Sequence, residues 1–403
     1  MNNLYQQKAT EALQKMLFPT QKWEAWKYTS VLKWKERSYE TKGEVRSTQL
    51  SICCIPNSDA HTYVFVNGQF HSACENSQQP KRMIVKLLAE LTEEEMEIAE
   101  KYFATLVSED RDIFSAQNLS TNCEGMFIYV PKNEVVETPI HIQHLSDSDL
   151  DQSFTHRNLV IVEKNASVKI IETQHGTSKN DSLRNAVSEI FVGENAQLEY
   201  VKVQNEGDKA SHVETSIVSQ GKNSKVYFYT LSFSGDIVRN NLLFHLEGQN
   251  VEANLFGTYL LSGSQHIDNH TEVHHKFPHG YSNELYKGIM TDTATGVFNG
   301  KIHVYQDAQK TNAYQSNKNI LLSDTANLYT KPQLEIYADD VKCSHGATTG
   351  QMNEEALFYL RARGIPEKAA KQLMTQAFAT EVIEGITMPF VKEYLTELIQ
   401  NRF

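Results

Sequence analysis

Between about residues 127 and 341 the chain consists of short apolar runs that alternate with small polar turns. No stretch of this region keeps the spacing of an amphipathic helix, so the pattern predicts β-strands. The clearest of these runs are LVIV (159–162), LEYVKV (198–203), VYFYTL (226–231) and LLFHL (242–246).

An asparagine recurs in the turns between these runs. Asn165, Asn195, Asn223 and Asn250 are 30, 28 and 27 residues apart. This near-constant period predicts a stacked β-solenoid, because one coil cannot bury its inward face without the next. Asparagine suits the corner because it tolerates the left-handed backbone region. A β-sandwich is the alternative, but its turns usually come closer together, every 8–12 residues or so.

Both ends of the chain have a helical pattern instead. The segment TEEE (92–95) is a capping box before an apolar stripe that reaches Leu106. Near the other end, Asn353 is the predicted N-cap of one helix, Gly364 follows its last turn, and Pro366 opens the next helix. Helices at both ends would cover the exposed sheet edges of a solenoid.

These patterns predict a mainly β fold, a parallel β-helix flanked by helical regions. We expect a mixed N-terminal region over 1–125, the β-helix core over 126–345 and a C-terminal helical domain over 346–403. The C-terminal helical domain begins directly after His345.

Composition narrows the functional classes. The chain has 403 residues, with 50 acidic against 38 basic side chains and a net charge of −12, which argues against binding nucleic acid or anionic lipid. Five cysteines at positions 53, 54, 74, 123 and 343 form no CxxC pair and fit a reducing compartment. The first residues lack the pattern of a signal peptide, and no apolar run is long enough for a membrane span. A cytoplasmic location is expected.

The sequence contains none of the common catalytic or nucleotide-binding motifs. It has no GxxxxGK[ST] loop, GxSxG elbow, GxGxxG turn or HExxH pair. We therefore expect this chain to bind no nucleotide itself and to have no catalytic residues.

Cys343 and His345 are the strongest candidates for a metal site. If their segment is extended, as the alternation of Leu334, Ile336 and Ala338 suggests, residues two apart point to the same face. A thiolate and an imidazole are good ligands for iron or zinc. Two ligands do not complete a tetrahedral site, so the others would come from elsewhere, such as another chain. The alternative is a buried thiol beside a hydrogen-bonded histidine; the other four cysteines are interpreted as small buried hydrophobic residues.

A second constellation is HIDNHTEVHH (266–275). In a strand, its histidine and acidic residues at alternate positions would share one face, with a metal-like composition. The alternative is a polar strand face held by hydrogen bonds. The aromatic-rich segment WEAWKYT (23–29) is interpreted as a cluster of side chains that packs the N-terminal helices against the rest of the chain.

Several segments of the sequence resemble the SufB/SufD family of the Suf iron–sulfur cluster assembly machinery, and within this family the SufD proteins. The string KPQLEIYADDVKCSHGATT (331–349), followed by FYLRARGI (358–365), is similar to the C-terminal signature of SufD. HIDNHTEVHH, PHGYSNELYKGI (278–289) and the KYT segment (27–29) are similar to other parts of SufD. SufB has a word like EHEATTS where this chain has CSHGATT, and the upstream cysteine of SufB is not found here.

The resemblance implies a right-handed parallel β-helix and a non-catalytic scaffold role. It implies pairing with SufB through the β-helix, and binding of the ATPase SufC through the C-terminal helices. A nascent iron–sulfur cluster would form at the SufB–SufD interface, with His345, supported by Cys343, on this side. The residues expected to dock the ATPase are Phe358, Tyr359, Arg361, Arg363 and Gly364.

Two other functions stay open at this point. A β-helix carbohydrate lyase or hydrolase would use carboxylates in a groove along the solenoid, although such enzymes are commonly secreted. A purely structural dimer scaffold would have no metal role. The sequence also leaves open whether the chain forms a homodimer without its partners.

Overall fold

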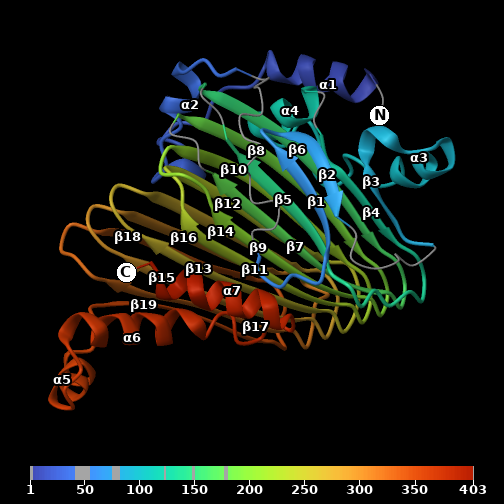
Figure 1. Ribbon diagram of the computed structural model, residues 1–403. Helices are drawn as coiled ribbons and strands as arrows, with labels where there is room; N and C mark the ends of the chain where they lie inside the picture. The colour runs from blue at the N-terminus through green and yellow to red at the C-terminus, as the bar shows by residue number, and fades with distance from the viewer. Residues whose placement is uncertain are drawn as a thin grey trace.

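The computed structural model describes residues 3–40, 55–74, 82–121, 124–147, 150–176 and 180–402. Its centre is a solenoid in which consecutive strands alternate between two sheets (Figure 1). Helices lie at both ends of the chain. The mainly β, parallel solenoid with helical ends confirms the fold predicted from the asparagine period.

The two sheets contain strands of odd and even number, respectively, from β4 onward. The first sheet has ten strands in the order β19 (Lys342–Gly350), β17 (Asn312–Leu321), β15 (Tyr281–Met290), β13 (Glu252–Leu261), β11 (Lys225–Ser234), β9 (Gln197–Asn205), β7 (Ser167–Gly176), β5 (Ile140–Ser146), β1 (His61–Val66) and β2 (Gln69–Cys74). The second sheet has nine strands in the order β18 (Asn327–Ile336), β16 (Thr295–Val304), β14 (His266–His275), β12 (Ile237–Leu246), β10 (Ala210–Gln220), β8 (Ser182–Val192), β6 (Gln152–Val162), β4 (Met126–Val130) and β3 (Ile84–Leu87). Neighbouring strands are parallel, except for the antiparallel pairs β1–β2 and β3–β4.

The predicted corner asparagines are in the left-handed region, with φ between 55° and 58° at Asn165, Asn195, Asn223 and Asn250. Their side chains form a ladder along the solenoid. Each Nδ2 donates a hydrogen bond to the Oδ1 of the asparagine one coil earlier, over 2.8–3.1 Å. The ladder begins one coil before the predicted series, at Asn133, whose φ is 64°.

The same corner continues beyond the asparagines. His279 and Lys310 also have positive φ, 63° and 62°. The backbone N–H of His279 donates to the carbonyl of Gln309, just before Lys310, as the N–H of Asn250 donates to that of Pro278, just before His279. The backbone corner is therefore repeated even where the side-chain ladder has ended.

Alternate residues of each strand point into the solenoid and form its main core. This core is apolar over long stretches, with stacked pairs such as Tyr200 and Phe228, whose ring centroids are 4.8 Å apart. The outward face of each sheet carries a second set of apolar residues. These need a separate cover because a sheet that is apolar on both faces cannot be left in water.

Helices from the two ends of the chain cover opposite sheets (Figure 1). The N-terminal helices pack on the nine-stranded sheet, for example Trp26 and Phe114 near Val213 of β10. They are α1 (Asn3–Leu13), η1 (Glu24–Trp26), α2 (Leu32–Glu36), η2 (Leu88–Glu90), α3 (Glu93–Ala99) and α4 (Ile113–Ser120). The C-terminal segment packs on the ten-stranded sheet through its last two helices, with Leu395 near Tyr229 of β11. Its helices are α5 (Glu354–Ala362), α6 (Glu367–Thr380) and α7 (Pro389–Gln400).

The predicted helix caps agree with the structure in detail. Thr92 and Glu95 form both hydrogen bonds of a capping box at the start of α3. The Oδ1 of Asn353 accepts from the N–H of Ala356, 3.0 Å away, and Gly364 follows α5 with φ 86°. The helix expected to reach Leu106 is shorter than expected, because α3 ends at Ala99 and the chain turns through Ala104 with φ 59°.

The expected domain limits at residues 125 and 345 stay predictions. The N-terminal region contributes β1, which pairs in parallel with β5, and the last strand β19 runs on to Gly350. Cys53, Cys54 and Cys123 lie outside the described residues. No described helix is long and apolar enough to cross a membrane.

We expect the Asn223 corner to be sensitive to its backbone conformation. Asn223→Ala removes both ladder hydrogen bonds and puts alanine, which tolerates the left-handed region less well than asparagine, at this corner, which should cost about 2 kcal/mol. Asn223→Gly removes the same hydrogen bonds but tolerates positive φ. Thermal unfolding should therefore rank the midpoints as native chain, then Asn223→Gly, then Asn223→Ala. An alanine variant as stable as the native chain would contradict this account of the corner.

Candidate functional site

Cys343 and His345 lie on β19, the last strand of the ten-stranded sheet. The register places Cys343 beside Ala313 and His345 beside Gln315 of β17. Both β17 residues are buried in the solenoid, and laterally adjacent residues of a sheet point to the same side. Cys343 and His345 therefore share the inward face, at the end of the solenoid where no further coil follows in the described chain.

The alternation of apolar residues suggested one continuous extended segment around Cys343 and His345, but the structure has two separate strands there. The strand β18 ends at Ile336, and the chain turns before β19 begins at Lys342. The two strands belong to different sheets. The Cys343–His345 pair thus lies beside the end of the other sheet rather than on an extension of it.

The two candidate ligands differ in environment. Cys343 is half-buried and packs against the small apolar cluster that closes this end, with Ala313 and Ala338 among its members. Burial raises the pKa of the Cys343 thiol, although the Ala313 backbone partly offsets this. His345 is exposed. Since the thiolate is the form that binds metal, His345 is the more readily available ligand of the two.

The described residues do not complete a metal site at Cys343 and His345. Within the described ranges, the one group of three histidine, cysteine or acidic side chains whose ligand atoms lie close together is His144, His156 and Glu172. We call this group the interior triad. It lies on β5, β6 and β7, far along the chain from β19.

The alternate residues of HIDNHTEVHH share one face, as predicted, and this is the outward face of β14. We call these residues the His266–His275 stripe; they are His266, Asp268, His270, Glu272 and His274. The stripe is held by polar contacts to the N-terminal region. The Oγ1 of Thr29 donates to Asp268 Oδ2 over 2.5 Å and lies 2.9 Å from His266 Nε2. Asp268 also pairs with Arg239 at 2.6 Å and with His270 at 3.0 Å. The stripe is thus the surface on which the KYT segment (27–29) packs. This arrangement corresponds to the second interpretation of the stripe, a polar strand face held by hydrogen bonds.

The rest of the aromatic-rich segment packs beside the same contacts. The Arg239 guanidinium lies over the Trp26 ring, 4.4 Å from its centroid, and Tyr28 stacks on Tyr329 with centroids 4.1 Å apart. Burial alone would raise the pKa of Asp268, but Arg239 and His270 hold it below its usual range. Asp268 is therefore a charged anchor between the N-terminal segment and the solenoid.

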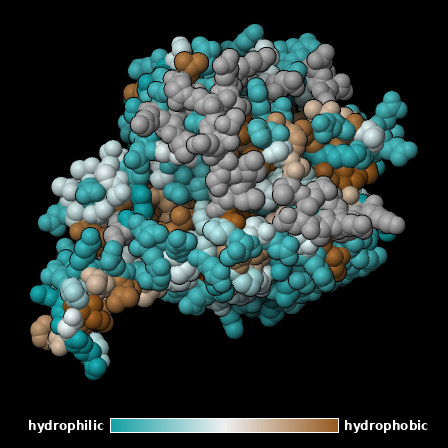
Figure 2. All heavy atoms as spheres, in the orientation of Figure 1, coloured by the Kyte–Doolittle hydropathy of each residue, from teal (hydrophilic) through white to brown (hydrophobic). Residues whose placement is uncertain are grey.

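The residues expected to dock an ATPase lie on or next to α5, which projects from the body beyond α6 (Figure 1). Phe358 is 73% exposed and Tyr359 is 56% exposed, and hydrophobic atoms are visible at the surface of this projection in Figure 2. Arg363 lies 4.6 Å from the Tyr359 ring centroid, and Arg361 pairs with Glu367 at 3.4 Å.

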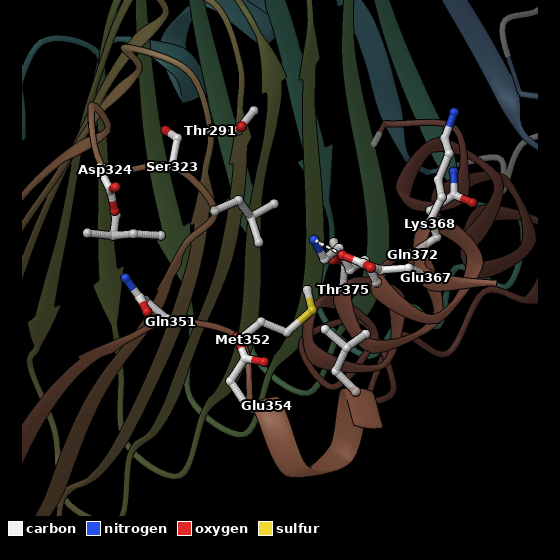
Figure 3. Close-up of a pocket in the computed structure, with 14 residues that line it drawn as sticks. Thr291, Ser323, Asp324, Gln351, Met352, Glu354, Glu367, Lys368, Gln372 and Thr375 are labelled. Atoms are coloured by element: carbon white, nitrogen blue, oxygen red, sulfur yellow. Dashed lines mark ion pairs between the residues drawn. The ribbon is translucent and has the colours of Figure 1, made fainter. Parts of the chain in front are cut away.

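A cavity of about 720 Å³ separates this helix pair from the strand ends. Thr291, Ser323 and Asp324 lie on the side of the solenoid, while Lys368 and Thr375 of α6 lie on the other (Figure 3). α6 itself is anchored to the sheet. Lys287 of β15 donates to the Phe378 carbonyl over 2.8 Å and pairs with Glu381.

Comparisons with known proteins agree with this architecture. Residues 144–378 match the family described as "SUF system FeS cluster assembly, SufBD core domain", and residues 1–142 match "SufBD protein N-terminal region". The chain belongs to the SufB/SufD family.

Curated members of the SufB/SufD family match along most of their length. An iron–sulfur cluster assembly SufBD family protein of Synechocystis is 31% identical over 98% of this chain and 90% of its own length. The iron–sulfur cluster assembly protein SufD of Escherichia coli is 28% identical over 98% of this chain and 92% of its own. SufD of Bacillus subtilis is 29% identical over 86% of this chain and 80% of its own.

Membership of the SufB/SufD family confirms the resemblance seen in the sequence. The chain is a Suf iron–sulfur cluster assembly subunit. A carbohydrate lyase or hydrolase is not favoured, because the core of the solenoid itself matches the assembly family.

The interior triad is the feature that the sequence analysis missed. A signal was present in HIQHL (141–145), where His144 continues the inward positions of Ile140 and Ile142. The outward positions of the same word hold a second histidine, so the pattern alone could not show which one points to the core. The partners of His144 come from β6 and β7, which only the stacking of coils brings together.

Proposed function

We propose that this chain is a SufD-type scaffold that holds one side of an iron–sulfur cluster assembly site. The partner on the other side would be SufB, bound end to end through the β-helix. His345, with Cys343 in support, would contribute to the nascent cluster, which is cargo and is handed on. The chain itself would have no catalytic residues, would bind no nucleotide and would work in the cytoplasm.

The observation that carries this proposal is the position of Cys343 and His345 on an edge strand. β19 pairs with β17 on one side and is the last strand of its sheet in the described chain. An edge strand presents unpaired backbone groups that can add a strand from another chain. A partner that joins there would lie directly over the inward-facing pair and could supply the missing ligands.

The chemistry of the two ligands favours a transient cluster. A neutral imidazole is a weaker and more labile ligand than a thiolate, which suits a cluster that must leave. The half-buried Cys343 has a raised pKa. We therefore assign the larger contribution to the exposed His345.

The same unpaired edge offers a place for a second copy of this chain. Two identical edges can pair about a two-fold axis, and such isologous contacts are the commonest route to dimers. We therefore propose that a homodimer forms in isolation and that SufB replaces one copy in the complex.

The C-terminal helices are the proposed docking surface for the ATPase SufC. Phe358 and Tyr359 are large, exposed and close to Arg361 and Arg363. Aromatic and arginine side chains are the usual anchors of protein interfaces. Because α6 is fixed to β15, movement of an ATPase bound at α5 would be transmitted to the last coils of the solenoid.

We expect His345→Ala to remove most of the bound iron and acid-labile sulfide from the anaerobically purified complex with SufB and SufC. Cys343→Ala should have a smaller effect. The matched control is Ser344→Ala, since Ser344 is exposed on the same strand but points to the other face. Size-exclusion chromatography should show that all three variants still assemble. A normal iron and sulfide load in both His345→Ala and Cys343→Ala would place the site elsewhere.

We expect Phe358→Ala to weaken SufC binding by about 2 kcal/mol, which is roughly a thirtyfold rise in Kd. The control is Phe277→Ala, because Phe277 is 41% exposed but lies between β14 and β15, away from α5. A point variant is preferable to truncation, since removal of α7 would uncover Tyr229 and its apolar neighbours. Calorimetric titration with equal affinities for both variants and the native chain would exclude α5 as the docking helix.

A further inference from the structure

The early coils of the solenoid contain a group of buried polar side chains next to the apolar core. The interior triad of His144, His156 and Glu172 lies on the inward positions of β5, β6 and β7, and each side chain is at most 1% exposed. Since β5 and β7 belong to one sheet and β6 to the other, the triad spans the interior from sheet to sheet.

The distances from Glu172 to the two histidines are those of ligands around one metal ion. Glu172 Oε1 lies 3.4 Å from His144 Nε2 and 3.3 Å from His156 Nε2. Two ligand atoms that are each about 2.1 Å from a tetrahedral metal are about 3.4 Å apart. The two imidazole rings are stacked, with centroids 4.1 Å apart, and so bring both Nε2 atoms to the same carboxylate oxygen.

These atoms have no other partners in the described structure. Neither contact has the direction of a hydrogen bond, and Glu172 Oε1 and all four ring nitrogens of His144 and His156 lack a hydrogen-bond partner. Buried polar atoms are almost always paired, and an unpaired group often indicates an absent water or ion. One ion between the three side chains would satisfy three of these five atoms, the two Nε2 atoms and Glu172 Oε1.

The other oxygen of Glu172 is already occupied. Tyr200 donates its hydroxyl to Glu172 Oε2 over 2.5 Å, and Lys202 Nζ lies 3.5 Å from the same oxygen. Lys202 also forms an ion pair with Glu214, so the positive charge of Lys202 is shared between two carboxylates. These contacts fix the carboxylate and leave Oε1 directed at the two histidines.

The charges around the triad leave room for a cation. The inward side chains near it include three carboxylates, on Glu172, Glu206 and Glu214, and two fixed cations, on Arg184 and Lys202. His212 lies between Glu206 and Glu214, at 3.5 and 3.1 Å. A buried excess of negative charge is expensive unless a cation compensates it.

We propose that the interior triad binds one first-row divalent metal ion, Zn²⁺ or Fe²⁺, through two imidazole nitrogens and one carboxylate oxygen. This donor set is typical of both ions, and Zn²⁺ is the tighter binder of the two by the usual order of affinities. The ion would link the two sheets across the interior and stabilise the early coils. The site is distinct from Cys343 and His345 and does not depend on the role proposed for them.

Because the triad is fully buried, the ion would be acquired during folding and exchange slowly afterwards. The test uses the full chain without a histidine tag, expressed in medium with zinc or with iron and purified anaerobically through a chelator. Elemental analysis should find about one metal ion per chain, and X-ray absorption should show nitrogen and oxygen ligands without sulfur. A native chain without stoichiometric metal, or metal bound through sulfur, would overturn the proposal.

Variants locate the ion. His144→Gln and His156→Gln should lose the metal and its contribution to the thermal midpoint. The matched control is His141→Gln, because His141 is equally buried on β5 but lies outside the triad, 2.8 Å from Thr173 Oγ1. His141→Gln and the double variant Cys343→Ala/His345→Ala should keep the ion. Equal metal content in His144→Gln and the control would overturn the assignment, and the spectrum of the native chain decides the matter if a triad variant fails to fold.

Discussion

Parallel stacking of coils is the constraint on which the rest of this structure depends. Each strand receives its backbone partners from the coils before and after it, so register is inherited along the whole solenoid. The Asn133 to Asn250 ladder repeats the corner, and every inward column then carries the same alternation. Such an arrangement cannot close on itself, and it must end in an edge.

The placement of function follows from that edge. At the first coils the N-terminal region adds the antiparallel strands β2 and β3, and at the last coil the described chain adds none. The inward column of Glu284 and Gln315 therefore ends at His345, which is exposed only because no further coil covers it. Inward positions that are buried in the earlier coils are therefore exposed at the last coil, where their side chains can bind a ligand.

The sequence was informative where one residue type reports one local conformation. Asparagine in the left-handed region gave the period, and Thr92 and Asn353 marked helix starts that the structure contains. His279 and Lys310 take the same corner without that signal, so the series appeared to end early. The role of the His266–His275 stripe was not predictable locally, because Thr29 and Asp268 meet across 239 positions of the chain.

The candidate site divides in the same way. The spacing of Cys343 and His345 was enough to predict a shared face, since alternation within one strand is a local property. It could not show that this strand is the last of its sheet, or that Cys343 packs into the closing cluster while His345 does not. The interior triad depends on three strands from two sheets, and its members become neighbours only through the stacking of coils.

The central claim is that the end of this solenoid is half of a cluster site and needs a second chain to complete it. Acid-labile sulfide per chain, measured after anaerobic purification, tests this most directly because a single bound metal ion carries no sulfide. The account predicts negligible sulfide on the chain alone and a defined amount on the complex with SufB and SufC. The same sulfide content on the isolated chain as on the complex would contradict it.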